Sequence, residues 1–209
     1  MDVAIPIVFP DYRISVPVGA RKVDIFKGWT WDNFTTPDIE TQWPGLGHAG
    51  VYFIDGKTGV TKYFEYGRYD KAGLGEAHNR SIPNVLVRDG KIVRDSLIAP
   101  LHRISTAAGH GGRIEGVYIE VNGGFAPMLK YAQLRVVENN NPKRKPYDIL
   151  NHSCVHFTKD VVAAAGIGTP WMLDPRPNSY IGEFRDDYPD LDYNPRTREL
   201  TLELEEAAK

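Results

Sequence analysis

The sequence predicts an α+β protein in which a mostly antiparallel sheet carries a helix on one face. Three patterns support this class. A hairpin pattern covers residues 51–66, short β-branched segments are separated by turn residues, and an apolar helical pattern begins at the only cysteine, Cys154. The 209 residues are 42% hydrophobic and 25% charged, which is enough for one substantial core. We therefore expect a single domain over residues 1–209.

The first segment is extended and rich in proline. Residues 3–18 contain many β-branched side chains, which favours strand, but Pro6, Pro10 and Pro17 cannot donate ladder hydrogen bonds. Because proline in sheets is found mainly at edges, we expect residues 1–28 to form edge strands or an extended arm.

An aromatic segment follows at residues 28–45. It is rich in turn formers and has neither helical nor strand periodicity, so it is predicted to be a long loop. Long ordered loops often bind ligands, and Trp29, Trp31 and Trp43 could line a substrate groove. The alternative, that these rings cover one end of the core, fits the sequence equally well.

His48 lies at the mouth of a predicted hairpin, with strands at residues 51–54 and 60–66. Glycines flank His48 and leave room for another backbone or a ligand. Glu65 lies on the return strand, where it could hold the second imidazole nitrogen as a triad carboxylate does. Considered singly, His48 also fits a structural histidine, and Glu65 fits a solvated strand position.

The middle and the end of the chain have weaker patterns. The expected elements are polar turns at 68–83, a small hairpin at 85–93, helices at 95–108 and 127–138, and a strand at 117–121. The basic triplet at 143–145 is too short to indicate nucleic-acid binding and is interpreted as a solvated turn.

Residues 174–209 are predicted to form a C-terminal extension. It contains a turn at 174–178, an acidic loop at 186–192 and a last strand at 196–205. The aspartates of the acidic loop lack the spacing of an EF-hand, so a surface loop is favoured over a calcium site.

The helix that begins at Cys154 is predicted from spacing. Apolar residues recur at intervals of three and four up to Ala165, Asn151 or Ser153 can cap its start, and Gly166 can end it. A thiol in the first turn lies near unpaired backbone N–H groups and the positive end of the helix dipole, which favour the reactive thiolate. The same N–H groups could stabilise an oxyanion. The alternative is a small buried hydrophobic residue, the commoner fate of a free cysteine.

Charge and hydropathy exclude several classes of protein. A formal net charge of −2 offers no broad attraction to nucleic acid or anionic membrane. No segment approaches the roughly 20 apolar residues of a membrane span, and the first residues lack the features of a secretory signal. We therefore expect synthesis in the cytoplasm without a signal peptide. A single cysteine also excludes an intramolecular disulfide.

Two segments resemble a known group of enzymes. Gly47-His-Ala-Gly-Val-Tyr-Phe53 with the following Lys62–Gly67, and Tyr147-Asp-Ile-Leu-Asn-His-Ser-Cys-Val-His-Phe157, resemble the circularly permuted papain-like cysteine hydrolases. That group includes NlpC-type hydrolases, PPPDE isopeptidases and the lecithin:retinol acyltransferase family. The asparagine that usually precedes the cysteine is replaced here by Ser153, and Asn151 stands three positions before the cysteine.

The resemblance implies roles for individual residues. Cys154 would be the nucleophile, His48 the general base and Glu65 the residue that orients the imidazole. Tyr147 would join the tryptophans of the aromatic loop in contacting substrate, and His156 would be structural. The resemblance implies no metal and no cofactor.

The function expected from this resemblance is an amidase or endopeptidase that cleaves peptide crosslinks of peptidoglycan. A looser similarity extends to the amidase effectors that bacteria inject into rivals by type VI secretion, which would add an immunity protein and a secretion apparatus as partners. One alternative is an isopeptidase, acyltransferase or thioesterase acting on a host protein or lipid. Another is a binding module in which Cys154 is inert.

Overall fold

The computed structural model describes residues 1–12, 14–16, 41–43, 47–70, 73–172, 174 and 176–203. The strands are β1 (Asp2–Phe9), β2 (Ile14–Val16), β3 (Thr41–Trp43), β4 (His48–Ile54), β5 (Thr61–Gly67), β6 (Glu76–Arg80), β7 (Val87–Arg88), β8 (Lys91–Ile92), β9 (Ile114–Val117), β10 (Ile119–Val121), β11 (Asp190–Asn194) and β12 (Glu199–Leu202). The helices are α1 (Ile98–Ala108), α2 (Phe125–Val137), α3 (Cys154–Ala163) and α4 (Pro177–Arg185), with short 3-10 helices η1 (Arg94–Leu97) and η2 (Glu138–Asn140).

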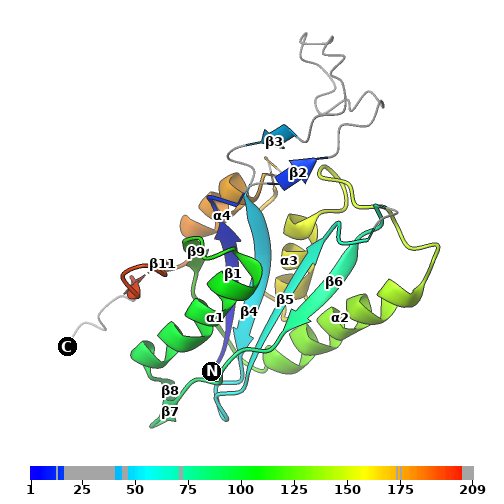
Figure 1. The fold of residues 1–209 in the computed structure, drawn as a ribbon. Coiled ribbons are helices and arrows are strands. Elements are labelled where there is room, and N and C mark those ends of the chain that lie inside the picture. The colour runs from blue at the N-terminus through cyan, green and yellow to red at the C-terminus, as the bar shows by residue number, and fades with distance from the viewer. Residues whose placement is uncertain are drawn as a thin grey trace.

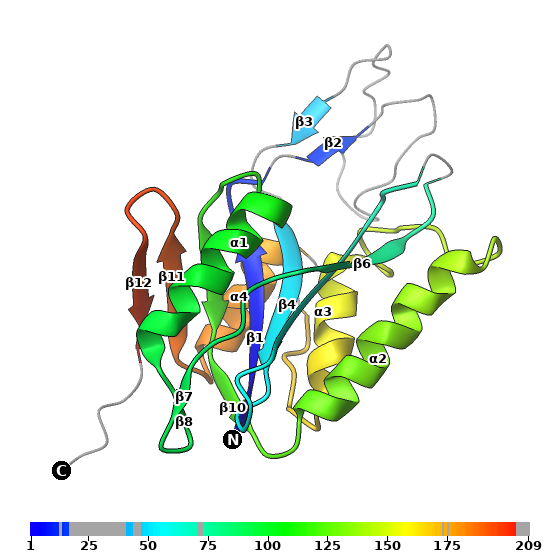
Figure 2. The same ribbon diagram turned by 60° about the horizontal axis from the view of Figure 1, so that its bottom comes forward.

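An eight-stranded sheet forms the centre of the protein (Figures 1 and 2). Its strands follow the order β12-β11-β9-β1-β4-β5-β6, β10 pairs with β1, and every pairing is antiparallel. Helix α1 covers one face, and α2, α3 and α4 cover the other. The α+β class, the antiparallel sheet and the packing of the cysteine helix on one face are therefore confirmed.

Side-chain alternation divides the core into two layers, one on each face of the sheet. On β4, Val51 and Phe53 pack toward α2, α3 and α4, whereas Tyr52 and Ile54 pack toward α1. Because side chains alternate along a strand, a sheet covered on both faces must be apolar at nearly every position. All seven residues of β4 are buried, as this arrangement requires.

The edge position predicted for the first strand is wrong. β1 lies in the middle of the sheet and pairs with β4 along its length, with Pro6 opposite Val51. On its other side, β1 pairs first with β10 and then with β9, and neither Ile5 nor Pro6 has a partner in those registers. The carbonyl of Pro6 faces β9 near Gly116. The N–H and C=O of one strand residue point to the same side, so the side on which proline lacks an N–H is the side of this interruption. The sheet thus accommodates a proline without losing a ladder bond.

Strand β6 and helix α4 are among the elements that the sequence did not predict. β6 was predicted to be turns because its sequence has no apolar alternation, but it pairs with β5, and the Asn139 side chain bonds both the N–H and the carbonyl of Ala77. Helix α4 replaces the turn predicted at 174–178. It begins with Pro177 in its first turn, a favoured place for proline, and buries Tyr180 and Phe184.

Other predictions agree with the structure. The hairpin at 85–93 forms as β7 and β8, with positive φ angles of 52° at Asp89 and 73° at Gly90 in its two-residue turn. The two helices predicted in the middle of the chain form as α1 and α2. The segment predicted as an aromatic loop includes strand β3, which pairs with β2.

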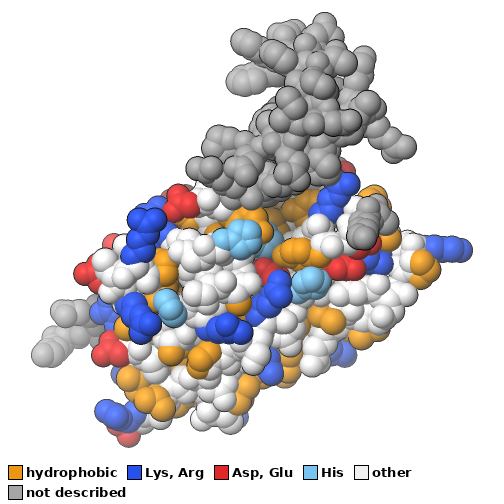
Figure 3. Space-filling model, in the orientation of Figure 1, with side chains coloured by type: hydrophobic (Ala, Val, Ile, Leu, Met, Phe, Trp, Pro, Cys, Tyr) orange, Lys and Arg blue, Asp and Glu red, His pale blue; other side chains and the backbone are white. Residues whose placement is uncertain are grey.

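The acidic cluster near the C-terminus is largely structural. The surface loop predicted at 186–192 is wrong for its last residues, because Asp190 and Asp192 lie in β11, which pairs with β9 and β12. Both aspartates are ion-paired with Arg185 of α4. Within the described part of the chain, no three His, Cys, Asp or Glu side chains are grouped as a metal site. In the same residues, no helix is long and apolar enough to cross a membrane. On the face shown in Figure 3, basic, acidic and histidine side chains lie among apolar ones, as the small net charge predicts.

Candidate active site

Cys154 is the first residue of α3, as its position in the sequence predicted. Ser153 is the N-cap residue and is extended, with φ −116° and ψ −179°, and it forms a capping box with His156. The Ser153 hydroxyl lies 2.9 Å from Nδ1 of His156. His156 therefore serves to start the helix, and the cap holds Cys154 in the first turn.

His48 and Glu65 come from neighbouring strands. His48 begins β4, and Glu65 lies on β5 directly opposite Gly50. A β-carbon on Gly50 would collide with the Tyr63 hydroxyl, so only glycine leaves room for this ring. Because the two strands pair, Nε2 of His48 lies 3.2 Å from Oε2 of Glu65.

The imidazole of His48 lies between the carboxylate and the sulfur. Nε2 of His48 faces Glu65, and the imidazole also hydrogen-bonds the side chain of Cys154. The structure thus brings together Cys154, His48 and Glu65, which are far apart in the sequence. The backbone N–H of Ala49, beside His48, also hydrogen-bonds the sulfur.

The charges of the pair favour ionisation. Burial alone would lower the pKa of His48, but its hydrogen bonds with Cys154 and Glu65, and their charges, outweigh burial and raise the pKa to about 9. Burial would raise the pKa of the Cys154 thiol, but the hydrogen bond and charge of His48 outweigh it and lower the pKa, helped by Tyr147 and Ala49. The contacts between the two side chains therefore favour the thiolate of Cys154 and the imidazolium of His48 over their neutral forms.

Three further residues hold this pair, and sequence reasoning did not find them. Arg80 of β6 donates from Nε to Oε1 of Glu65 at 2.7 Å, and the Tyr63 hydroxyl donates to Oε2 at 3.3 Å. The Tyr69 hydroxyl lies 3.3 Å from Nε2 of His48. Tyr63 could have been found, since it lies two residues before Glu65 on the same strand face. Arg80 could not, because β6 was not predicted.

Aromatic rings enclose the imidazole on its other sides. Phe9 stacks on His48 with ring centroids 6.1 Å apart, and Tyr12 lies 5.1 Å away at an interplanar angle of 37°. These rings restrict rotation of the imidazole, so it stays directed at Glu65 and Cys154.

Tyr147 contacts the sulfur directly. Its hydroxyl donates to Sγ of Cys154 at 3.6 Å and accepts the Cys154 backbone N–H at 3.4 Å. Tyr147 is predicted to contact substrate, and the structure places its hydroxyl at the sulfur of Cys154. Trp29 and Trp31 lie outside the described residues, and only the backbone of Trp43 is described, in β3, so the predicted aromatic groove stays a prediction.

The side chains of the candidate site are nearly enclosed. Cys154, His48 and Glu65 expose 2%, 5% and 1% of their surface, whereas Tyr69 exposes 38%. A carbonyl can therefore reach Sγ only if a neighbouring side chain moves aside. Tyr147 and Tyr69 are suitable, because each is held at the site by a weak hydrogen bond of 3.3 Å or longer.

Replacing Glu65 with glutamine is expected to destabilise the fold by about 2–4 kcal/mol at pH 7, because it leaves His48 and the partly exposed Arg80 without their carboxylate. Burial would raise the pKa of Glu65, but His48 and Arg80 outweigh burial and lower it. The stability from this lowered pKa is present above the unfolded-state pKa of about 4.3 and is lost as pH falls through the folded-state value.

Urea unfolding of the wild-type and Glu65→Gln proteins from neutral to acid pH measures this effect. The difference between them should shrink on acidification. Glu120→Gln, at an exposed strand position, is the matched control and should change stability by no more than about 0.5 kcal/mol. A difference between the wild type and Glu65→Gln that does not depend on pH would contradict the charge argument.

Comparison with known proteins gives two matches. A family model described as type VI secretion system effector, TseH-like, matches residues 4–167. The crystal structure of the type VI secretion system effector TseH is similar to this chain, with 34% sequence identity and a TM-score of 0.77, over 96% of this chain and 97% of that chain. No curated protein gives a match.

Proposed function

Because this chain belongs to the TseH-like family of type VI secretion system effectors, we propose that it is a cysteine-dependent hydrolase of permuted papain-like fold that cleaves amide bonds in peptidoglycan peptides. Membership of this family implies secretion by a route that needs no signal peptide. The observation that carries the enzymatic part is the set of contacts joining Cys154, His48 and Glu65.

The proposed reaction begins with attack of the Cys154 thiolate on the carbonyl carbon of the substrate amide. As the carbon–sulfur bond forms, the carbonyl π electrons move to oxygen. The imidazolium of His48 then donates a proton to the amide nitrogen, the carbon–nitrogen bond breaks, and the amine leaves. The product bound to the protein is a thioester.

A water molecule completes the cycle. Neutral His48 takes a proton from this water, whose oxygen attacks the thioester carbon and releases the carboxylic acid and the thiolate. Glu65 stabilises the imidazolium that is regenerated, as the carboxylate of a catalytic triad does.

The developing oxyanion needs donors near the sulfur. The backbone N–H groups of Cys154 and Ala49 both lie at this end of α3, together with the Tyr147 hydroxyl. Movement of Tyr147 away from the sulfur would open the approach and free the Cys154 N–H for the oxyanion. In this proposal, Tyr147 acts both in the entry of substrate and in the stabilisation of charge.

The ionised pair favours an enzyme over an inert binding module. An inert buried cysteine lies among apolar groups that raise its pKa, whereas here a histidine, a tyrosine hydroxyl and a backbone N–H lower it. A bacterial target would require an immunity protein in the producing cell, and we propose one as the partner that covers this site.

Digestion of purified peptidoglycan fragments tests the proposal. Wild-type protein should release new amine ends and carboxyl ends, detected by amine labelling and mass spectrometry of the fragments. No release from peptidoglycan, together with cleavage of an ester or of a ubiquitin-type isopeptide bond, would replace the proposed substrate with that of the alternative reactions.

A further inference from the structure

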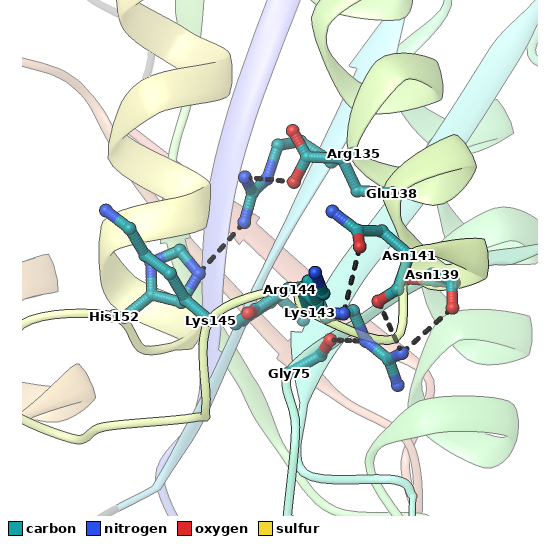
Figure 4. Close-up of a pocket in the computed structure, with 10 residues that line it drawn as sticks. Gly75, Arg135, Glu138, Asn139, Asn141, Lys143, Arg144, Lys145 and His152 are labelled. Atoms are coloured by element: carbon teal, nitrogen blue, oxygen red, sulfur yellow. Dashed lines mark hydrogen bonds and ion pairs between the residues drawn. The ribbon is translucent and has the colours of Figure 1, made fainter.

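A second feature of the molecule is a cavity of about 390 Å³ beside the candidate active site. It lies between the end of α2, η2, the start of β6 and the segment that leads to Cys154, and Figure 4 shows the side chains around it. The lining residues are Tyr66, Gly75, Arg135, Glu138, Asn139, Asn141, Lys143, Arg144, Lys145 and His152. Four of them are lysine or arginine and one is acidic, so the lining carries a surplus of positive charge.

Arg135 is fixed in this cavity by three contacts. Its guanidinium is ion-paired with Glu138 at 2.5 Å and donates to Nε2 of His152 at 3.1 Å (Figure 4). It also lies 5.4 Å from the ring centroid of Tyr66. Since Nε2 of His152 accepts this bond, the imidazole is neutral. Burial, and then the charges of Arg135 and Lys145, lower the pKa of His152 in agreement with this.

Arg144 has a structural role. Two carboxylates outside the lining neutralise it, Asp70 at 2.6 Å and Glu76 at 3.0 Å, and its Nε donates to the carbonyl of Gly75. These bonds hold residues 141–147 against the start of β6.

Lys143 and Lys145 differ from Arg144. Among the described residues, neither ammonium group has a carboxylate partner, and both residues are exposed. Lys143 and Lys145 thus line the same cavity as the fixed guanidinium of Arg135, and their unpaired charges suit it to binding an anionic group.

The cavity is joined to the nucleophile through two stacked rings. Tyr66 forms part of the lining, and its ring centroid lies 5.9 Å from that of Tyr147. The Tyr147 hydroxyl lies 3.6 Å from Sγ of Cys154. With the distance from the Tyr147 ring centre to its hydroxyl added, the Tyr66 wall of the cavity lies within about 12 Å of the sulfur, which is the span of about three to four extended residues.

We propose that this cavity binds a carboxylate of the peptide substrate about three to four residues from the bond that is cleaved. The proposal rests on the proposed function, because it assigns the cavity to the same substrate as Cys154. Lys143 and Lys145 supply the charge, and Arg135 supplies a directed donor. Peptidoglycan stem peptides carry carboxylates along their length, so the chemistry of the cavity matches the proposed substrate class.

Binding to the Cys154→Ser protein tests the proposal without requiring turnover. The probes are a fluorescently labelled peptidoglycan stem peptide with free carboxylates and the same peptide with its carboxylates amidated. The free acid should bind about tenfold more tightly, and the preference should weaken with added salt. In a variant that also carries Lys143→Gln and Lys145→Gln, the preference should fall below about twofold.

The matched control adds Lys57→Gln and Lys91→Gln instead. These lysines are exposed in hairpins and do not line the cavity, so the same loss of charge should leave the preference intact. Equal binding of the two peptides, or a preference that survives Lys143→Gln/Lys145→Gln, would overturn the proposed subsite. A free-acid peptide that binds with this preference but is not cleaved by wild-type protein would instead overturn the proposed hydrolase, so the two failures are distinguishable.

Discussion

Replacing Cys154 with serine should reduce cleavage of peptidoglycan fragments by about 10³-fold or more. Serine has nearly the same shape, but its hydroxyl is a far weaker acid than a thiol, whereas His48 lowers the pKa of the Cys154 thiol. The loss should appear in kcat, because the sulfur acts in the bond-forming step. Initial rates of amine release from defined fragments measure it.

The stability of the serine variant provides its control. Cys154 packs in the core against the sheet, and a hydroxyl in its place can still bond to Tyr147, so the thermal midpoint should change little. Retention of activity within about tenfold of wild type, by a folded serine variant, would remove Cys154 from the reaction and with it the proposed mechanism.

Replacing His48 with alanine should lower kcat/KM by about 10³-fold or more, since the variant loses both the cation that ionises Cys154 and the acid that protonates the leaving amine. Without His48, burial would leave the thiol protonated at neutral pH. In the wild type, activity should rise with pH as Cys154 ionises and fall as His48 loses its proton, near pH 9. Measuring kcat/KM of both proteins as a function of pH tests this rise and fall of activity.

His102→Ala is the matched control for this variant. His102 lies on α1 and hydrogen-bonds the Tyr193 hydroxyl at 3.1 Å, on the face of the sheet that α1 covers. Losing this imidazole should leave kcat/KM within about threefold of wild type, as for a substitution that touches no catalytic group. A loss for His102→Ala as large as for His48→Ala would show that general destabilisation explains the effect.

Local patterns predicted the parts of the site that short stretches of sequence determine. The helix after Cys154, its cap at Ser153 and the hairpin that carries His48 and Glu65 all follow from spacing and turn residues over a few positions. The alternation of side chains along β5 then places Glu65 on the same face as His48. These features depend on interactions between near neighbours, which a single sequence records well.

Long-range pairing decided what the sequence did not predict. β1 became central because Pro6 meets the interruption between β9 and β10, which are more than 100 residues later in the chain. β6 formed because it pairs with β5 and is bonded by Asn139, although its own residues favour turns. Arg80 therefore reached Glu65 through an element with no local strand pattern.

The same limit explains why the basic triplet was interpreted as a solvated turn. Its three residues differ in role because Arg144 meets Asp70 and Glu76 from a distant part of the chain, while Lys143 and Lys145 remain unpaired among the described residues. Only the fold shows that the two lysines line the same cavity as Arg135.

The ultraviolet absorbance of the thiolate, followed through a pH titration, tests most directly whether His48 ionises Cys154. Cys154 is the only cysteine, so the signal belongs to one residue. Wild-type protein should titrate below the ordinary cysteine pKa of about 8.5, and His48→Ala should titrate above it. A wild-type titration at or above the ordinary value, unchanged by His48→Ala, would contradict the proposed ion pair and the reaction built on it.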